Sequence, residues 1–448
     1  MVYARNASFP PPDIFMHLVN LPLATSDAVP PFGSGRIAHL LVEARAEFMA
    51  HGYQHLSVDR LARASGVSKE TIYRYFPDKE AIFRAAVEGL DNPIAGRLRP
   101  LDPAADPVEV LAGCARLIHD ASVDKRASFL WIAIAVVRDF PDLATTLSVG
   151  GLAVMEPIRR YLEALAAAKG RARPIAPELA GQLGALAVDG PRYLMGIPPL
   201  PAEARASAAR QTARLFLHGC LVGAAGFEPA AWQAEIAPPP HRFAPHLEQL
   251  LSEARIQFYA RGFCGANLDE IGAAARVGRG TLYRHFSNKA GLFAAAMTHA
   301  ADELAARAAP HSVRGHLAER LRLLAEDASS VLCSPECVKL YRTVIGESRR
   351  EPEVARQVYL RTRRPFLAPV TAWLVEAKEQ GLLAVGDPDW AARQFLTLAT
   401  AGNRPLTSDL VFGWEERRRL AERSVGVFMH GYMFQSTPDQ DAGATARS

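Results

Sequence analysis

An internal repeat constrains this chain more than any other feature. With an offset of 210 residues, segments 44–87 and 254–297 align without a gap and are identical at 16 of 44 positions. Weaker similarity extends to the run Phe216–Gly219, which corresponds to Phe428–Gly431 at an offset of 212. Because a repeated segment folds as a repeated structural unit, we expect each half of the chain to be one copy of the same architecture.

Composition marks the ends of the two copies. Residues 223–242 contain Pro229 and the triplet Pro238–Pro240, which cannot continue a helix, so we interpret this segment as a linker. Residues 1–34 and 436–448 show little periodicity and are expected to be disordered tails. The remaining sequence divides into four predicted domains, of which the first and third are the closely matched parts of the repeat: 35–90, 91–222, 243–300 and 301–435.

Composition also excludes several classes of protein. Hydrophobic residues make up 49% of the 448 positions and charged residues 22%, which is typical of a folded, helix-rich protein. The longest strongly apolar run, Phe129–Val137, is shorter than the roughly 20 residues of a membrane-spanning helix. Prolines at positions 10 to 12 interrupt the segment where a secretion signal needs an apolar stretch, and the five cysteines are scattered. We therefore expect a cytoplasmic protein with reduced thiols and no membrane partner.

The sequence contains no constellation of residues that predicts catalysis. The motifs GxSxG, HExxH, GxGxxG and the phosphate-binding loop are all absent. Cys333 and Cys337 form a CxxxC pair, but no neighbouring histidine or cysteine completes a zinc site. We expect neither an enzyme nor a bound cofactor. The net charge of +4 permits nucleic-acid binding without requiring it, so the distribution of charge along the chain is more informative than its total.

Apolar residues at helical spacing predict an all-α fold in both copies. The stripes end at Gly52 and at Gly262, where glycine adopts the left-handed end of a helix at little cost. The members of the two stripes are Ile37, Leu40, Leu41, Ala44 and Phe48 in the first copy, and Leu247, Leu250, Leu251, Ala254 and Phe258 in the second.

Two short helices follow the stripe of the first copy. Ser57 is the expected N-cap of a helix over 58–64, and a tight turn at Ser65–Val67 leads to a third helix capped by Ser68. Two short helices joined by a glycine turn are the geometry of a helix-turn-helix, whose second helix enters the major groove of DNA.

The second copy departs from the first at its cap and at its turn. Asn267, with Glu270 three residues later, has the spacing of a capping box for a helix over 268–274. The position equivalent to Gly66 is Arg276. Because a non-glycine residue in the left-handed region costs about 1 kcal/mol, this turn is expected to be strained or differently shaped.

These segments resemble a known family. The stretch Ala44–Phe83, centred on Gly66–Lys79, resembles the N-terminal signature of TetR/AcrR-family transcriptional regulators, and Val277–Lys289 resembles the same signature. Segments 340–402 and 412–432 resemble the C-terminal body of that family. The resemblance implies two tandem all-α units, each with a three-helix DNA-binding domain followed by a helical ligand-binding and dimerisation domain.

The third helix of each copy carries most of the candidate DNA contacts. In the first copy Ile72 and Phe76 should face inward, whereas Lys69, Thr71, Tyr73, Arg74 and Tyr75 should be exposed. The full set predicted to bind DNA is Ser57, Ser68, Lys69, Glu70, Thr71, Tyr73, Arg74, Tyr75 and Lys79 in the first copy, and Asn267, Arg279, Gly280, Thr281, Tyr283, Arg284, His285 and Lys289 in the second.

The resemblance assigns phosphate binding to two positions in each copy. It implies that Tyr73 and Tyr283 bind phosphate through their hydroxyl groups, and that Lys79 and Lys289 do so from the start of the fourth helix. Simple packing of the tyrosines and ordinary solvation of the lysines are the alternatives.

The other candidates have less certain roles. Arg74 and Arg284 could hold a phosphate or read guanine, and we favour phosphate. The front of the third helix, Lys69–Glu70 and Arg279–Gly280, holds the stronger candidates for reading bases. Capping explains Ser57 and Asn267 about as well as a phosphate contact does.

Local charge distinguishes the two copies. Segment 67–79 has a balance of +1, and segment 276–289 has a balance of +4. The charged residues are Lys69, Arg74 and Lys79 against Glu70 and Asp78 in the first segment, and Arg276, Arg279, Arg284 and Lys289 in the second. Because attraction to phosphate grows with such contacts, we expect the second copy to bind DNA more tightly and less selectively.

The predicted C-terminal bodies offer candidates for a ligand cavity. Five aromatic residues could line a site for a small apolar effector, although core packing is the favoured role for any single one: Trp131, Tyr193, Trp373, Trp390 and Tyr432. His218 and His430 match in the repeat and are interpreted as structural residues near helix ends. Asp189–Arg192 and Gly402–Pro405 are interpreted as equivalent loops.

The leading hypothesis from the sequence is a DNA-binding, ligand-responsive repressor. Helix-turn-helix proteins commonly bind double-stranded DNA operators as dimers, and here fusion supplies both halves, so we expect a single-chain pseudo-dimer on an imperfect palindrome. Two alternatives remain open. The chain could form a homodimer with four DNA-binding heads, or it could be a small-molecule sensor or interaction protein whose DNA binding has weakened.

Overall fold

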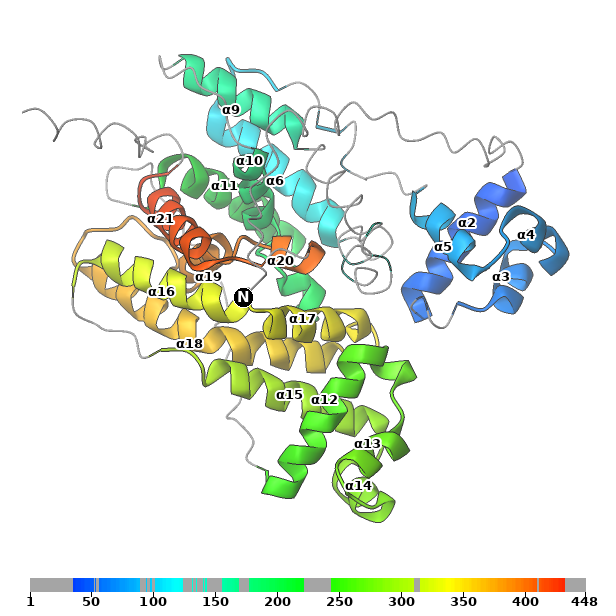
Figure 1. The fold of residues 1–448 in the computed structure, drawn as a ribbon. Coiled ribbons are helices and arrows are strands. Elements are labelled where there is room, and N and C mark those ends of the chain that lie inside the picture. The colour runs from blue at the N-terminus through cyan, green and yellow to red at the C-terminus, as the bar shows by residue number, and fades with distance from the viewer. Residues whose placement is uncertain are drawn as a thin grey trace, which may run out of the picture. The chain divides into compact units, whose positions relative to one another are not determined.

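The computed structural model describes the chain, with gaps, from residue 35 to residue 431. The described residues are 35–51, 53, 56–88, 94, 97–98, 101–123, 131, 134, 140, 142, 155–168, 177–220, 243–309, 315–408 and 411–431. The predicted tails and linker, Gly52 and Tyr432 lie outside them. Throughout the described ranges the chain forms helices and no strand, which confirms the all-α prediction (Figure 1).

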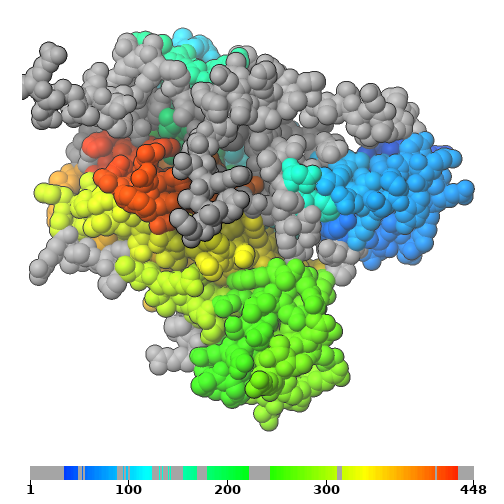
Figure 2. All heavy atoms as spheres, in the orientation of Figure 1, coloured from blue at the N-terminus to red at the C-terminus, as the bar shows by residue number. Residues whose placement is uncertain are grey.

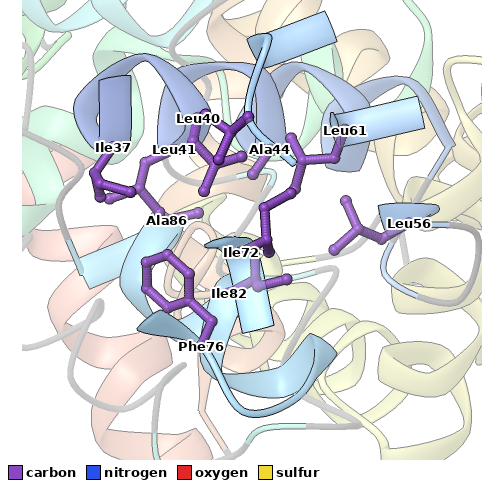
Figure 3. Close-up of a cluster of buried hydrophobic side chains, with 11 residues drawn as sticks. Ile37, Leu40, Leu41, Ala44, Leu56, Leu61, Ile72, Phe76, Ile82 and Ala86 are labelled. Atoms are coloured by element: carbon purple, nitrogen blue, oxygen red, sulfur yellow. The ribbon is translucent and has the colours of Figure 1, made fainter. Parts of the chain in front are cut away.

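The first of two compact units, Met1–Leu90, contains one helix-turn-helix domain. Its helices are α2 (Gly35–His51), α3 (Val58–Ser65), α4 (Lys69–Tyr75) and α5 (Lys79–Glu88). The predicted apolar stripe of α2 is buried against Leu61, Ile72 and Ile82, which come from the other three helices (Figure 3). The helical spacing of the stripe therefore identified the buried face of α2 correctly.

The second unit, Asp91–Ser448, contains the other helix-turn-helix domain. Its helices are α12 (Pro245–Gly265), α13 (Leu268–Ala274), α14 (Arg279–Phe286) and α15 (Lys289–Ala305). Gly262 has φ 68° and ψ 176° and interrupts α12, so the regular helix ends at the predicted glycine. The predicted stripe from Leu247 to Phe258 is buried, as in the first copy.

The remaining helices of the second unit form two related bodies. The first contains α6 (Pro107–Val123), α9 (Glu156–Ala168), α10 (Pro177–Ala187), η2 (Arg192–Met195) and α11 (Ala202–His218). The second contains α16 (Leu317–Leu332), α17 (Pro335–Glu347), α18 (Pro352–Glu379), α19 (Pro388–Ala399), α20 (Arg404–Thr407) and α21 (Trp414–His430). Helix α6 packs against α11 as α16 packs against α21, and the red α21 lies beside the yellow-green α16 in Figure 2. The bodies therefore repeat one packing scheme.

The loops that follow α10 and α19 are equivalent, as the sequence predicts. Asp189 and Gly190 have φ values of 53° and 62°, and Ala401 and Gly402 have φ values of 53° and 61°. Two consecutive left-handed residues are uncommon, so their recurrence at an offset of 212 residues is independent evidence for the duplication.

The last helices of the two bodies pack against each other (Figure 1). Helices α11 and α21 end at His218 and His430, the matched histidines that the sequence places near helix ends. Immediately after α11 the amide of Cys220 donates to the carbonyl oxygen of Phe428, at 2.9 Å. Helix α10 likewise packs against α19. These contacts between the halves thus join equivalent elements, α11 with α21 and α10 with α19.

The second helix-turn-helix domain is attached directly to this assembly. Helix α12 packs against α17, and α15 packs against both α17 and α18. The short helix η2 of the first body packs against the same two helices, α17 and α18. Within the described residues, no helix is both long enough and apolar enough to cross a membrane.

Candidate nucleic-acid interface

Helices α4 and α14 present the same pattern of exposed and buried residues. Ile72 and Phe76 are buried, as predicted, and so are their counterparts in α14. Tyr73 and Tyr283 are 49% and 48% exposed, although both are large aromatic residues. The arginine and the ring that follow each tyrosine are also exposed: Arg74 and Tyr75 in α4, and Arg284 and His285 in α14.

Exposure of the tyrosines argues against simple packing as their role. A half-exposed aromatic ring on a short helix leaves its hydroxyl group free to meet a phosphate, whereas a packed tyrosine would bury the ring. Thr71 differs from expectation because it is only partly exposed, as is Thr281. Thr71 lies against the helix start, where its hydroxyl accepts a hydrogen bond from the Ser68 hydroxyl at 2.9 Å.

The predicted caps form in the first copy. Ser57 accepts a hydrogen bond from the amide of Arg60 at 3.3 Å, and Ser68 accepts one from the amide of Thr71 at 3.2 Å. Both hydroxyl groups therefore have a structural role in the free protein. Gly278, which replaces Ser68 in the second copy, has no side chain to cap α14.

The capping box predicted in the second copy does not form. Asn267 does cap α13, because its side chain accepts from the amide of Asp269 at 2.8 Å. The second half of the box is absent: the carboxylate of Glu270 accepts hydrogen bonds from Arg261 at 2.6 Å and from Gln257 at 3.3 Å. The backbone amide of Asn267 donates instead to the side-chain oxygen of Gln257 at 3.4 Å. A cationic neighbour on α12 thus competes successfully for the Glu270 carboxylate.

The turn of the second copy has the same handedness as that of the first. Gly66 has φ 66°, and Arg276 at the equivalent position has φ 56°. The prediction of a strained turn is therefore supported, and a differently shaped turn is not needed. The amide of Val277 donates to the carbonyl of Gly272 at 2.8 Å, and a Cβ atom on Gly272 would lie only 2.9 Å from the Val277 oxygen. Glycine at position 272 allows this close approach.

The front of each recognition helix holds a cation paired with a carboxylate. Lys69 forms an ion pair with Asp59, and Arg279 forms a bidentate ion pair with Asp269. Both aspartates lie at the start of the preceding helix, ten residues earlier. Glu70 and Gly280, the other predicted base readers, are exposed beside these cations. Neither aspartate was predicted as part of the interface, although Asp59 and Asp269 are identical in the repeat and so could have been found there.

The two lysines at the start of the fourth helix are not ordinary solvated charges. The ammonium group of Lys79 lies 4.9 Å from the centroid of the Tyr53 ring, and that of Lys289 lies 5.2 Å from the Phe263 ring. Lys289 also donates to the carbonyl of Cys264 at 3.0 Å. Burial lowers the pKa of both lysines. An aromatic ring therefore holds each ammonium group in place beside a helix N-terminus, where an anion would be favoured.

The aromatic residues proposed for a ligand cavity are largely core residues. Trp131, Trp373 and Trp390 are buried. Trp390 and Tyr193 also line a cavity of about 20 Å³ between α6, α10, α11 and α19, which has room for about one water molecule. Cys333 and Cys337 are buried, and among the described residues no three metal-binding side chains come together.

Comparisons with known protein families agree with this geometry. The family described as "Bacterial regulatory proteins, tetR family" matches residues 40–86 and again residues 250–296. The family described as "AefR-like transcriptional repressor, C-terminal domain" matches residues 319–433. The first match covers the helix-turn-helix domain of both copies, and the second covers the body of the second copy.

Individual proteins resemble shorter parts of the chain. The transcriptional regulator TcmR of Streptomyces glaucescens is 28% identical over 79 residues, which are 18% of this chain and 35% of TcmR. The nucleoid occlusion factor SlmA of Actinobacillus pleuropneumoniae is 42% identical over 45 residues, which are 10% of this chain and 22% of SlmA. The chain thus spans about a third or less of the length of these relatives. A solved TetR-family regulator from Mesorhizobium loti is 23% identical, with a TM-score of 0.37, and the match covers 42% of this chain and 97% of that protein.

Proposed function

Because the chain belongs to the TetR family and carries two tandem copies of its DNA-binding domain, we propose that it is a ligand-responsive transcriptional repressor. We propose further that it binds its operator as a single-chain pseudo-dimer. The observation that carries the proposal is the matching pattern of exposed and buried residues on α4 and α14, with Tyr73 and Tyr283 exposed at equivalent positions in one chain. One short recognition helix reads few bases, so two linked helices provide the specificity that a homodimer usually supplies.

Packing between the bodies supports an intramolecular pair. Helices α10 and α11 pack against α19 and α21, which are their counterparts in the repeat. Equivalent helices of the two halves therefore bury each other within one chain, and no second chain is required for this packing. The description of the matched C-terminal domain as that of a repressor supports repression.

The proposed operator is an imperfect palindrome of double-stranded DNA. Lys69 and Glu70 begin one recognition helix, whereas Arg279 and Gly280 begin the other, so the two half-sites are expected to differ at the bases these residues meet. The proposed effector is a small molecule that binds in one of the helical bodies and changes the spacing of the two heads. Half-sites about 34 Å apart, or a multiple of that distance, would match two heads on one face of the duplex.

A mobility-shift assay with DNA from upstream of the protein's own gene tests the proposal. We expect Tyr73→Phe and Tyr283→Phe each to weaken binding by about 10- to 100-fold, because a hydrogen bond to a charged group contributes about 1.5–3 kcal/mol. Tyr161→Phe is the matched control, since its hydroxyl group is buried in the first body and has no hydrogen-bond partner.

The outcomes separate the candidate functions. Unchanged binding in both tyrosine variants would show that α4 and α14 are not the DNA-contacting surface. A protein that binds no upstream fragment, in wild-type form and at low salt, would favour the sensor with weakened DNA binding.

A further inference from the structure

A buried ion pair joins the two halves of the chain. The Nε atom of Arg393 in α19 donates to Oδ2 of Asp189, which follows α10, at 3.2 Å. Both side chains are 7% exposed. The guanidinium of Arg192 lies 3.7 Å from the same carboxylate oxygen, from within the first half. The Asp189 carboxylate therefore pairs with one arginine from its own half, Arg192, and with one from the other half, Arg393.

The repeat does not reproduce this ion pair on the opposite side of the junction. At the offset of 212 residues, Asp189 corresponds to Ala401 and Arg393 corresponds to Gly181. The backbone is equivalent, because Asp189 and Ala401 have the same φ value of 53°. Only the side chains differ, so one side of the junction has a carboxylate and an arginine where the other has a methyl group and a hydrogen atom.

A second polar contact between the halves is also one-sided. The indole Nε1 of Trp131 in the first half donates to the carbonyl of Ile345 in the second, at 2.9 Å. At the offset of 211 residues that aligns Pro141 with Pro352, the counterpart of Trp131 is Arg342, whose Nε atom donates to the carbonyl of Leu406 of its own half at 3.0 Å. Arg342 therefore uses its polar group within its own half and does not mirror the indole contact.

From these contacts we infer that the junction selects an unlike partner: each half of this chain pairs with the other half in preference to a second copy of itself. This inference rests on the proposed single-chain pseudo-dimer and names the partner that its junction accepts. Pairing of two second halves would bury two Arg393 side chains opposite Ala401, without the Asp189 carboxylate. Pairing of two first halves would place Asp189 opposite Gly181. The first self-pairing would bury Arg393 away from the Asp189 carboxylate, and the second would leave Asp189 with Arg192 alone. Because the loss of a partner from a buried ion pair is unfavourable, both self-pairings are disfavoured relative to the mixed pair.

A cut in the linker of the folded protein tests the inference. A protease site is inserted between Pro229 and Pro238, and the purified full chain is cleaved at that site. Cleaved protein is mixed with an isotope-labelled batch until labelled and unlabelled halves have exchanged, and native mass spectrometry then identifies each dimer. We expect mixed dimers only, with homodimers below about 5% of the total, against half of the total for random pairing.

A double substitution tests whether the ion pair causes the selectivity. Asp189→Ala with Arg393→Ala is expected to raise the homodimer fraction at least several-fold. The matched control is Asp302→Ala with Arg361→Ala, which removes a partly buried ion pair between α15 and α18 within the second half and is expected to leave partner choice unchanged.

The possible results are distinguishable. Homodimers at the random fraction in the unsubstituted protein would overturn the inference, while DNA binding by the intact chain, measured with the tyrosine variants, could still stand because the linker keeps the halves together. Dissociation of the cleaved protein into single halves would overturn both the inference and the intramolecular pairing. The unsubstituted protein carries the main test, so the result does not depend on the folding of a variant.

Discussion

At the scale of single residues, Lys79 and Lys289, the candidate phosphate-binding lysines, have the same kind of surroundings in the two copies even where the neighbouring residue differs. Tyr53 becomes Phe263 between the copies, yet each ring lies beneath the lysine that begins the fourth helix. An aromatic face attracts a cation whether or not it carries a hydroxyl group. The lysine environment is therefore maintained by ring geometry, which either residue provides.

Substitution of these lysines is expected to change the salt dependence of DNA binding. Lys79→Gln and Lys289→Gln should each reduce the slope of log affinity against log salt concentration by about 1, because each lysine is proposed to neutralise one phosphate. Fluorescence anisotropy at four or five salt concentrations measures the slope. Lys339→Gln, at an exposed position on α17, is the control and should leave the slope unchanged. An unaltered slope in both test variants would refute the phosphate contacts.

His119 is a buried titratable residue at the junction of the halves. Its Nε2 atom lies 3.0 Å from the hydroxyl group of Tyr193, and its Nδ1 atom lies 3.5 Å from a carboxylate oxygen of Asp120. Burial lowers the pKa of His119 below the usual 6.5, against the opposing effects of Asp120 and Asp189, while Arg205 adds to the lowering. The unfolded chain therefore takes up a proton at a higher pH than the folded chain does.

This difference predicts a loss of stability in mild acid. As the pH falls below about 6.5, protonation favours the unfolded state, so the melting temperature should decrease. His119→Gln should show a smaller decrease between pH 7 and pH 5 than the unsubstituted protein, and thermal unfolding followed by circular dichroism measures it. His430→Gln, at an exposed helix end, should keep the full decrease. An equal decrease in the His119 variant would contradict the assignment.

At the scale of elements, the ends of α11 and α21 cross at a distance that only glycine permits. Gly219 and Gly431 have φ values of 71° and 72°. A Cβ atom on Gly219 would lie 2.4 Å from the carbonyl oxygen of Met429, and one on Gly431 would lie 2.3 Å from the amide nitrogen of His218. The two glycines therefore allow the backbones of the halves to meet.

Alanine at either crossing glycine is expected to destabilise the junction. Gly219→Ala adds a methyl group against backbone atoms and places alanine in the left-handed region, so a loss of about 2 kcal/mol or more is expected. Thermal unfolding of the full chain measures the effect. Gly346→Ala is the matched control, because its position in α17 is helical and a Cβ atom there meets nothing within 4 Å. A helical Gly→Ala change of this kind stabilises by up to about 1 kcal/mol. Equal melting temperatures for the two variants would argue against a tight crossing.

At the scale of the whole molecule, the duplication allows the two halves to diverge. In a homodimer every substitution appears twice, on both sides of the junction. In a single chain, Asp189 and Arg393 can occupy one side while Ala401 and Gly181 occupy the other. The same freedom applies to the recognition helices, which begin with different residues.

The single-chain pseudo-dimer predicts both the stoichiometry and the symmetry of the DNA complex. Light scattering should give one chain of 48.6 kDa in the free protein and one chain per operator in the complex. Hydroxyl-radical footprinting should show two protected half-sites of different sequence. A mass of about 97 kDa, twice that of the chain, would support the homodimer with four heads. A perfectly symmetric operator would count against pairing within one chain.

The sequence by itself determined the elements and their surfaces. Local spacing predicted the buried stripe of α2, the tight turn at Gly66, the helix end at Gly262 and the exposure of Tyr73, because these features depend on residues one to four positions apart. Aligning the repeat with itself added the equivalence of the loops at Asp189 and Ala401.

Only the tertiary structure decided which side chains meet. The capping box at Asn267 failed because Arg261, brought close by the fold, holds the Glu270 carboxylate. The ion pair of Asp189 with Arg393 joins residues 204 positions apart, and no local pattern encodes such a contact. The pair can influence which halves associate because it is buried: a charge exposed to water would lose little free energy without its partner. The repeat can therefore be detected in the sequence, whereas the asymmetry of the junction depends on contacts that form only when the two halves pack against each other.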